Sequence, residues 1–268
     1  MNVPEPSLNL LVLDVGNTNT VVGVFEGAAL RAQWRLTTSH EQTADEYGIL
    51  IRNLFSLGGI STDTVTGVMI ASVVPPLNAV LEEMSKKYFK LTPLFLEPGI
   101  RMGMAIHYDN PQEVGADRIA NSVAAFEKYG GPCVVVDFGT AITFDIISEK
   151  GEYLGGIIAP GIGISSEALF ERAARLPRVE VREPERVIGT NTVASMQAGL
   201  FYGSVGMMDG ILDRLAGELG QGMKVIATGG QAALVASSSK YKPTVDSSLT
   251  LEGLRIIYER NHSAARRK

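Results

Sequence analysis

A short block of residues that occurs twice, 123 positions apart, constrains this chain more than any other feature. The first copy covers residues 14–20 (DVGNTNT) and the second covers residues 137–143 (DFGTAIT). Both copies begin with Asp-x-Gly and end in Thr, and each lies between an apolar strand pattern and a β-branched strand pattern. A spacing close to half of the 268 residues is too long for a solenoid repeat. The block therefore indicates two halves of related topology.

The rest of the chain supports a division into two α/β domains. Strand and helix patterns alternate through both halves, which is typical of an α/β fold. A chain of 268 residues has room for about two domains. The pair Gly130-Gly131 follows a predicted helix and precedes the second series of strands, so we place the boundary there. The predicted domains are residues 8–130 and residues 131–260.

The predicted elements follow the hydrophobic period and the turn residues. Strands are expected at residues 8–15, 20–25, 33–36, 65–73, 133–138, 140–147 and 225–227. Helices are expected at residues 43–57, in a segment that ends near residue 90, and at residues 115–129, 165–176, 191–219 and 247–260, with a short helix after residues 228–230. Residues 155–163 are expected to form a glycine-rich connection, and residues 261–268 a disordered tail.

Composition and charge exclude several classes of protein. There are 24 basic and 29 acidic residues, and the net charge of −5 disfavours a protein that wraps nucleic acid. Cys133 is the single cysteine, which excludes an internal disulfide and a cysteine-rich metal site. No apolar run approaches the length of a membrane span and the start lacks signal-peptide features, so we expect a cytoplasmic protein that does not bind membranes. Glycine, at 29 residues, exceeds its usual share of about 7%, which indicates turns, close backbone approach or phosphate loops.

The first block has the chemistry of a phosphate site. Gly16 allows close backbone approach, and residues 17–20 add amide and hydroxyl donors to the main-chain N–H groups. Asp14, at a strand end, is a carboxylate that suits Mg²⁺. A plain polar turn uses the same residue types and remains an alternative. The second copy favours function, because two such turns can face each other across a cleft, where Thr140 offers a hydroxyl and Asp137 a further oxygen ligand.

Another candidate site lies where residues 114–118 (VGADR) open a predicted helix. The helix dipole favours the charged form of Asp117 in the first turn, which predicts a lowered pKa for this carboxyl. Asp117 is either a capping residue beside a solvated Arg118 or a general base beside an anion-binding arginine. Tyr108, in the turn before this helix, is either a half-buried packing residue or the wall of a substrate pocket.

The remaining glycine clusters are less specific. Residues 155–163 contain neither Gly-Lys-Ser/Thr nor Gly-x-Gly-x-x-Gly, although the helix start that follows them suits an anion. Residues 228–230 (TGG) lie either near a nucleotide or in a plain strand-to-helix turn. Four glycines recur along the helix predicted at residues 191–219: Gly199, Gly203, Gly206 and Gly210. Each costs a helix about 1 kcal/mol relative to alanine, which favours close helix packing within or between subunits.

Taken together, these motifs resemble those of type III pantothenate kinases, which belong to the acetate/sugar kinase, heat-shock chaperone ATPase and actin superfamily. The likeness extends from about Leu10 to about Tyr258. It is carried by residues 14–18, 108, 110–111, 115–118, 137–141, 155–156, 160–161, 191–192 and 228–230. The phosphate motifs mark the superfamily, whereas Gly-Ala-Asp-Arg between the two Asp-x-Gly motifs is specific to this family. The resemblance implies an α/β fold of two similar ribonuclease H-like domains with a nucleotide cleft between them.

The resemblance also implies a role for each matching residue. Asp117 is the base that takes the proton from the primary hydroxyl of pantothenate, and Asp137 binds a monovalent cation, K⁺ or NH₄⁺. Mg²⁺ bridges the phosphates of ATP, and the chain forms a homodimer with Thr192 at its interface. The implied ATP contacts are Asp14, Val15, Gly16, Asn17, Thr18, Asn19, Thr20, Val21 and Thr140. The implied pantothenate contacts are Tyr108, Gly115, Ala116, Asp117, Arg118 and Thr192.

The implied activity is the ATP-dependent phosphorylation of pantothenate to 4′-phosphopantothenate, the first step of coenzyme A biosynthesis. Two cations and two backbone loops would offset the charge of the triphosphate in place of a P-loop lysine. Two alternatives remain open. One is a transcription accessory factor, which the acidic balance of charges disfavours as a direct DNA binder. The other is a kinase or phosphatase of the same superfamily that acts on another substrate.

Overall fold

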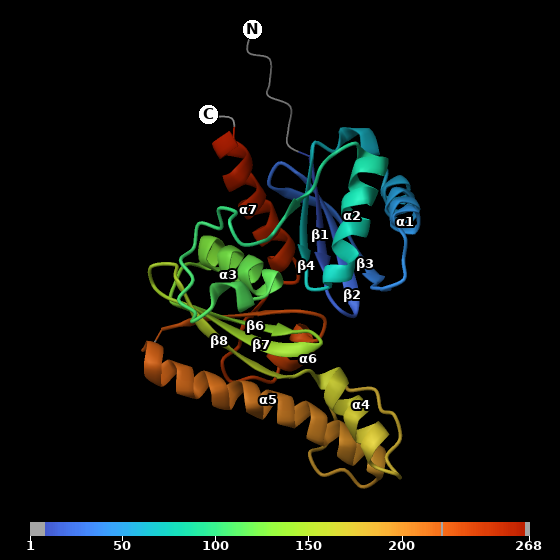
Figure 1. Ribbon diagram of the computed structural model, residues 1–268. Coiled ribbons are helices and arrows are strands. Elements are labelled where there is room, and N and C mark those ends of the chain that lie inside the picture. Colours follow the sequence, from blue (N-terminus) through green and yellow to red (C-terminus); the bar gives the residue numbers. More distant parts are fainter. Residues whose placement is uncertain (1–8, 221, 266–268) are drawn as a thin grey trace. The chain divides into compact units, whose positions relative to one another are not determined.

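A computed structural model describes residues 9–220 and 222–265, which form two compact units (Figure 1). The described part of unit 1 comprises residues 9–103, 112–123 and 250–265. The described part of unit 2 comprises residues 104–111, 124–220 and 222–249. The predicted domains are two continuous segments, whereas each unit is assembled from separate segments of the chain.

Unit 1 is built on a five-stranded sheet, sheet 1, with the strand order β3-β2-β1-β4-β5. Its strands are β1 (Asn9–Val15), β2 (Asn19–Glu26), β3 (Ala29–Thr37), β4 (Gly67–Ser72) and β5 (Leu94–Phe95). The strands β1, β2 and β3 are antiparallel neighbours, while β4 runs parallel to β1 and β5 runs parallel to β4. The central strand β1 is an almost continuous apolar run because both faces of the sheet are covered there.

Unit 2 contains a second five-stranded sheet, sheet 2, with the order β8-β7-β6-β9-β10. Its strands are β6 (Cys133–Phe138), β7 (Ala141–Ile147), β8 (Tyr153–Pro160), β9 (Lys224–Thr228) and β10 (Thr244–Val245). Each pair of neighbours has the same direction as its counterpart in sheet 1. Strands β6 to β10 therefore repeat β1 to β5 in order and in direction. The predicted α/β fold with two related halves is confirmed.

The helical elements of unit 1 are α1 (Ala44–Leu57), η1 (Thr62–Thr64), η2 (Pro75–Leu77), α2 (Asn78–Met84), the π-helical η3 (Ser85–Phe89) and nearly all of α7 (Leu249–Ala265). Helices α1 and α2 cover one face of sheet 1, where Tyr47 and Leu81 join a buried cluster with Leu13 and Ile70. Helix α7 covers the other face, because a Cβ on Gly23 would lie 2.8 Å from the Leu251 side chain. Helices thus cover both faces of the sheet.

Helix α1 begins as the sequence predicts. The side chain of Thr43 accepts a hydrogen bond from the backbone N–H of Glu46, and the Glu46 carboxylate accepts one from the backbone N–H of Thr43 at 2.7 Å. This reciprocal pair is the capping box, which satisfies two donors at the helix start. Gly58 follows the last residue of the helix and donates its N–H to Leu54.

Unit 2 contains α4 (Ile162–Arg172), α5 (Thr192–Leu219) and α6 (Ala232–Ala236), and α3 (Ala116–Tyr129) and η4 (Pro111–Glu113) pass from one unit to the other. Alternate residues of β6 and β7 turn one face of sheet 2 toward α5, so Val136 and Phe144 share a buried cluster with Phe201. Among the helices of the described residues, none combines the length and the apolar character needed to cross a membrane.

Two predictions about local structure are wrong. Most of the expected connection at residues 155–163 is the edge strand β8, which pairs with β7. Its glycines hid the strand pattern, because glycine is rare in strands.

The expected disordered tail begins too early, since α7 continues to Ala265. Asn261 holds this last part in place, because its side chain bonds both the N–H and the carbonyl of Arg101 at 3.0 Å. The final residues 266–268 lie outside the described part.

Candidate functional site

The first Asp-x-Gly block forms the turn between β1 and β2 in unit 1. Gly16 donates its N–H to the carbonyl of Asn19 at 3.0 Å, which closes the turn. Asn17 and Thr18 are exposed at its tip. Thr20 is fully buried, and its hydroxyl shares a hydrogen bond of 2.9 Å with the hydroxyl of Thr38. The turn therefore combines a polar exposed tip with an anchored base.

Asp14 lies on the face of sheet 1 opposite α1 and α2. Its neighbours Leu13 and Val15 point into the buried cluster beneath those two helices. Since side chains alternate along a strand, Asp14 points to the other face, and it is partly buried there. This position is the second-to-last in β1.

The second Asp-x-Gly block occupies the equivalent place in unit 2. Asp137 is the second-to-last residue of β6, and it lies on the face of sheet 2 opposite α5 because Val136 and Phe138 point into the cluster with that helix. Gly139 donates its N–H to the carbonyl of Ala141 at 3.0 Å. Thr140 is exposed in this turn. The repeated sequence therefore forms a repeated structure.

Two glycines that follow other strands enclose the second turn. A Cβ on Gly161, directly after β8, would lie 2.2 Å from the carbonyl oxygen of Thr140. A Cβ on Gly229, directly after β9, would lie 2.4 Å from Oδ1 of Asp137, and Gly229 has a φ of +92°, in the left-handed region that favours glycine. Neither position accepts a side chain without movement of the turn. Asp137 and the hydroxyl of Thr140 supply hard oxygen atoms, which fit K⁺ and Mg²⁺ by chemistry.

Asp117 and Arg118 lie in the first turn of α3, in the part that belongs to unit 1. Oδ1 of Asp117 accepts a hydrogen bond from the backbone N–H of Arg118 at 2.8 Å. A Cβ on Gly115 would lie 2.5 Å from the same oxygen, so the glycine leaves room for the carboxyl group. Arg118 is buried, and Ser122 donates its hydroxyl to the Arg118 carbonyl at 2.8 Å.

The predicted direction of the Asp117 pKa shift is wrong. Burial raises the pKa of Asp117 above its usual value, and this effect outweighs the backbone hydrogen bond and the charge of Arg118, which both lower it. The helix dipole alone predicts a lowered pKa for Asp117, and the burial that opposes it is not visible in a motif. A carboxyl with a raised pKa is a stronger base when it is ionised.

Tyr108 lies in unit 2 and is half-buried, within the segment of residues 104–111, most of which is exposed. Its ring packs against the ring of Tyr153 at the start of β8, with the ring centres 6.3 Å apart. Thr192 is also in unit 2 and is exposed at the first position of α5, after the capping residue Asn191. Within unit 2, the middle of α5 packs on the face of sheet 2 opposite Asp137.

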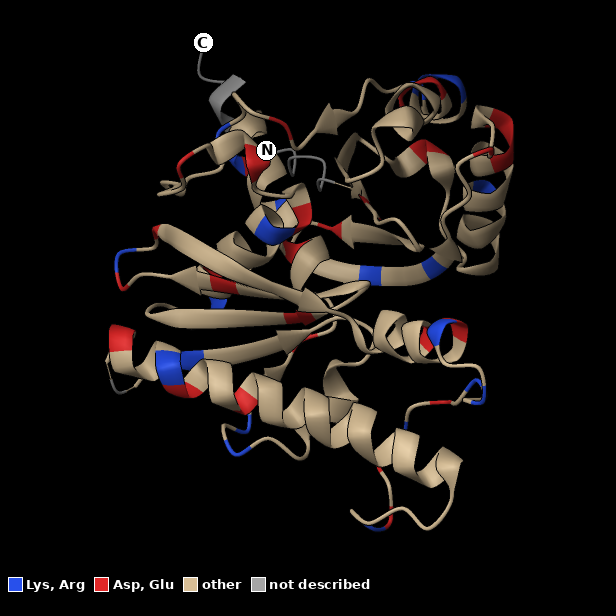
Figure 2. Cartoon of the chain, turned by 60° about the horizontal axis from the view of Figure 1, so that its bottom comes forward, with Lys and Arg blue, Asp and Glu red and all other residues tan. Residues whose placement is uncertain are grey.

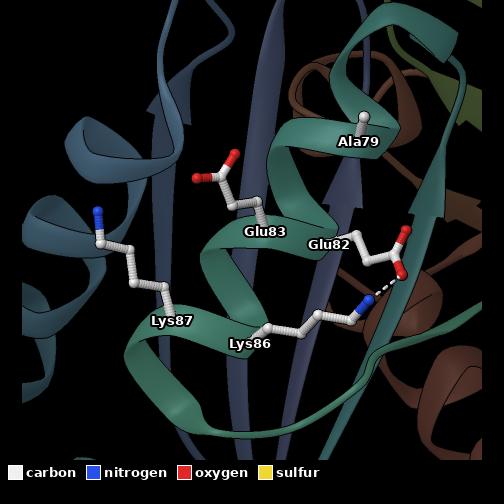
Figure 3. Close-up of a pocket in the computed structure, with 5 residues that line it drawn as sticks. All are labelled: Ala79, Glu82, Glu83, Lys86 and Lys87. Carbon is white, nitrogen blue, oxygen red and sulfur yellow. Dashed lines mark hydrogen bonds and ion pairs between the residues drawn. The ribbon is translucent and has the colours of Figure 1, made fainter.

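A surface hollow of about 500 Å³ lies elsewhere in unit 1 (Figure 3). It is lined by Ala79, Glu82, Glu83, Lys86 and Lys87, none of which is a predicted site residue. Its two lysines form ion pairs: Lys86 pairs with Glu82 one helical turn away, and Lys87 pairs with Asp45 on α1. The hollow is a solvated face of α2 and η3.

Sequence reasoning missed one group of polar residues in unit 2. Asp145 is the only charged residue of β7 and is fully buried, and Tyr153 donates its hydroxyl to it. A lone carboxylate in an apolar strand was a signal in the sequence, since a buried charge needs hydrogen-bond partners.

Comparison with known sequences gives matches over nearly the whole chain. A sequence model of the type III pantothenate kinase family matches residues 10–214. The chain is similar to the type III pantothenate kinase of Koribacter versatilis, with 59% identity over 269 residues that cover 97% of this chain and 98% of that protein. It is also similar to the type III pantothenate kinase of Myxococcus xanthus, with 61% identity over 255 residues that cover 95% of this chain and 100% of that protein.

Solved structures share the fold at lower sequence identity. A Baf family protein from Campylobacter jejuni has a TM-score of 0.57 and 24% identity, covering 94% of this chain and 99% of that one. The ethanolamine utilization protein EutJ from Carboxydothermus hydrogenoformans has a TM-score of 0.55 and 15% identity, covering 95% of this chain and 91% of that one. At these identities the likeness shows a common fold alone.

Proposed function

The chain belongs to the type III pantothenate kinase family, and on that premise we propose that it transfers the γ-phosphoryl group of ATP to the primary hydroxyl of pantothenate. The product is 4′-phosphopantothenate, and the reaction is the first step of coenzyme A biosynthesis. The observation that carries the proposal is the family match over residues 10–214, which includes both Asp-x-Gly turns and the Gly-Ala-Asp-Arg motif. The likeness to the Campylobacter jejuni protein shows fold alone and lends no support to a role in transcription.

In this proposal Asp117 is the general base. Its carboxylate takes the proton of the pantothenate hydroxyl as the new oxygen–phosphorus bond forms and the bond from the γ-phosphorus to the bridging oxygen breaks, which releases ADP. An ordinary aspartate is a weak base because its pKa lies near 3.9. Burial raises the pKa of Asp117, which strengthens the base. The loose transition state of phosphoryl transfer leaves proton removal late, so a moderate base suffices.

The turn of unit 1 is the proposed ATP phosphate segment. Gly16 has no side chain to keep a phosphate from its backbone, and exposed Asn17 and Thr18 supply polar side chains beside the main-chain N–H groups. The other residues of this segment are Asp14, Val15, Asn19, Thr20 and Val21. Of these, buried Thr20 acts by anchoring the turn. The carboxylate of Asp14 would hold Mg²⁺, which neutralises phosphate charge when it is bound.

The turn of unit 2 is the proposed site of the monovalent cation and of a further nucleotide contact. Asp137 would hold K⁺ or NH₄⁺, and exposed Thr140 would contact the nucleotide with its hydroxyl. The close approach of Gly161 and Gly229 supports this assignment, because backbone without a side chain packs against the Thr140 carbonyl and against Oδ1 of Asp137.

The pantothenate contacts proposed from the family are Tyr108, Gly115, Ala116, Asp117, Arg118 and Thr192. Arg118 suits the carboxylate of pantothenate, since a guanidinium binds a carboxylate through two parallel hydrogen bonds. Tyr108 offers an aromatic wall and a hydroxyl. Gly115 and Ala116 keep the N-terminus of α3 free of bulky side chains.

We also propose that the chain forms a homodimer through α5. The stretch from Thr192 to Met208 carries no charged residue, and Figure 2 shows charges only toward the far end of this helix. A Cβ on Gly199, Gly203 or Gly206 would find nothing within 4 Å, so the close packing that these glycines indicate is not made within the described part of the chain. A second copy of α5 would cover this face and offset the cost of glycine in a helix.

A substitution on α5 tests the dimer. Gly203→Arg places a bulky charge on the proposed interface, and we expect a monomer in sedimentation equilibrium. Gly217→Arg is the matched control, since Gly217 is an exposed glycine of the same helix with nothing within 4 Å. A dimer that survives Gly203→Arg, or a wild-type protein that is monomeric, would exclude this interface.

The activity itself is tested by ADP release in the presence of pantothenate. We expect turnover with ATP, Mg²⁺ and pantothenate, and an increase when Na⁺ is replaced by K⁺ or NH₄⁺ at constant ionic strength. Turnover that is equal in Na⁺ and K⁺ would refute the cation site at Asp137. Absence of turnover with pantothenate under all these salts would refute the substrate.

A further inference from the structure

We propose that Asp145 and Tyr153 form a buried positioning pair that holds Tyr108 in place and thereby sets the affinity for pantothenate. The proposal rests on the proposed function, in which Tyr108 contacts pantothenate. Neither Asp145 nor Tyr153 belongs to the predicted site. All three residues lie in unit 2, and their contacts with one another are made within that unit.

Asp145 is unusual for its location. Strand β7 is otherwise free of charge, and Asp145 is its fifth residue with no exposed surface. A buried carboxylate is costly unless hydrogen bonds replace its water shell. A plain packing role at this position would be served by valine or isoleucine, which the neighbouring positions Ile146 and Ile147 carry.

Two hydroxyl groups of the same sheet point to this carboxylate. Tyr153 donates its hydroxyl to Oδ1 at 2.9 Å, and Thr143 donates its hydroxyl to Oδ2 at 3.5 Å. Tyr153 is fully buried as well. A hydrogen bond to a carboxylate is roughly twice as strong as one between neutral groups, so the phenol of Tyr153 is fixed at its far end.

A β-bulge places Tyr153 on the face of sheet 2 that carries Asp145. The register of β7 and β8 pairs Ile146 with Gly155 but Ile147 with Tyr153, so Leu154 is the extra residue. Without the bulge Tyr153 would lie on the same face as Gly155, among the side chains toward α5. With it, Tyr153 lies on the face of Ile147 and hence of Asp145.

Space for the phenol ring comes from the pairing itself. Gly156 is the residue directly opposite Asp145 in the ladder, and it has no side chain. The glycines that disguised β8 as a connection therefore have a function in this arrangement: Gly156 leaves room beside the carboxylate, and Gly155, with a φ of +138°, accommodates the bulge.

The other side of Tyr153 holds the segment that carries Tyr108. The backbone N–H of Tyr153 donates to the carbonyl of Ala105 at 2.9 Å, and the N–H of His107 donates to the carbonyl of Tyr153 at 2.8 Å. The ring of Tyr108 then packs on the ring of Tyr153 at an angle of 55°. A shift of Tyr153 would move Ala105, His107 and the Tyr108 ring together.

This arrangement predicts an effect on binding and not on the chemical step. In this proposal Tyr153 packs against Tyr108 and does not itself contact the substrate. Loss of the Tyr153 hydroxyl would therefore let the Tyr108 ring move, and this ring forms the wall of the pocket. Interactions that are equal in the bound complex and the transition state change KM and leave kcat alone. A merely structural role would lower the stability without this selective effect.

The test is Tyr153→Phe, which removes one hydroxyl and keeps the ring. We expect the KM for pantothenate to rise about tenfold, with kcat and the KM for ATP within about twofold of wild type. The matched control is Tyr129→Phe in the same unit, because Tyr129 also donates its hydroxyl to a carboxylate, that of Asp246, at 2.8 Å. The control should lose stability and keep the KM for pantothenate. An unchanged KM in Tyr153→Phe, or equal increases in both variants, would overturn the proposal.

Two further variants separate this proposal from the function on which it rests. Tyr108→Leu removes the proposed wall, and an unchanged KM for pantothenate would refute the contact and the positioning pair together. A raised KM in Tyr108→Leu with a normal one in Tyr153→Phe refutes the pair alone.

If Tyr153→Phe fails to fold, Asp145→Asn takes its place, since the amide oxygen still accepts from Tyr153 without a charge. A KM for pantothenate raised by about threefold at unchanged kcat then supports the pair, and an unchanged KM overturns it.

Discussion

Asp14 in unit 1 and Asp137 in unit 2 stand at the same place in the same topology, yet their surroundings differ. Each is the second-to-last residue of a central strand, and two residues later a glycine closes the turn with its N–H. In unit 1 the residue after the third strand is Thr38, and in unit 2 it is Gly161. Both donate an N–H to a carbonyl of the turn, that of Thr18 at 3.0 Å and that of Thr140 at 3.2 Å.

The difference lies in what fills the space beside each turn. In unit 1, Thr38 uses its side chain and bonds the hydroxyl of Thr20. In unit 2, Gly161 and Gly229 bring bare backbone against the turn, at distances that exclude a Cβ. The framework is therefore repeated while the chemistry is not. One turn presents polar side chains, and the other is surrounded by backbone.

The helices that follow the last strand of each sheet show the same divergence. The second residue of α3 is Asp117, and the second residue of α7 is Thr250. Thr250 is a neutral residue, and its hydroxyl donates a hydrogen bond to Oδ1 of Asn121 at 2.7 Å. Of these two equivalent helices, only α3 has a carboxyl group at its second residue. A single carboxyl agrees with a phosphoryl transfer that needs a single base.

The largest expected effect comes from the position that differs most between the two helices. Asp117→Asn removes the proposed base and keeps its size, so kcat should fall about 10²–10⁴-fold, while the KM for pantothenate changes little. Steady-state kinetics with ADP release measures both constants. Asp109→Asn, an exposed aspartate of the chain, is the control and should keep full activity. A kcat within threefold of wild type in Asp117→Asn would mean that the two helices do not differ in this way.

A second test compares the two equivalent aspartates directly. Asp137→Asn should raise the K⁺ concentration for half-maximal activity by about 10–100-fold, and Asp14→Asn should do the same for Mg²⁺. The two variants have the same change at the same topological position, so each is the control of the other. Titration of activity with KCl and with MgCl₂ gives the four values. If both variants shift the same cation, the turns have not diverged in function.

A third test concerns the backbone around the second turn. Gly161→Ala places a Cβ 2.2 Å from the Thr140 carbonyl oxygen, which should cost about 1–3 kcal/mol and raise the KM for ATP. Gly163→Ala, two residues later in α4, meets nothing within 4 Å and should stabilise the protein slightly. Thermal unfolding and ATP kinetics compare the two variants. Equal Tm values would show that the turn of unit 2 accepts a Cβ at Gly161 without cost.

The smallest expected effect is the pH dependence of stability that Asp117 causes. Its pKa is raised in the folded protein, so the unfolded chain loses the proton first as pH rises. Stability therefore declines as pH rises from the unfolded pKa through the folded one. The Asp117→Asn variant has no ionisable group at this position. Its Tm should therefore rise relative to that of the wild type as the pH increases from 4 to 8. Thermal melts across this range test it, and a difference in Tm that is independent of pH would contradict the raised pKa.

Sequence patterns predicted the local elements well where short-range signals are strong. The strand Cys133–Phe138 agrees to the residue, and Thr43 with Glu46 marks the start of α1 because the capping box is made within four residues. Patterns failed at β8, where glycines serve a bulge and a tyrosine ring that are set by the partner strand. They also failed at the pKa of Asp117, because burial depends on distant segments.

The repeat, the two Asp-x-Gly turns and the family can be predicted from the order of the residues alone, because these features are carried by residues that are neighbours in the chain. Tertiary structure decided the rest: the glycines that enclose Asp137, the bulge that turns Tyr153 toward Asp145, and the burial that raises the pKa of Asp117. Each of these depends on strand register and on packing between segments far apart in the sequence. A local pattern contains no information about what such partners place beside it.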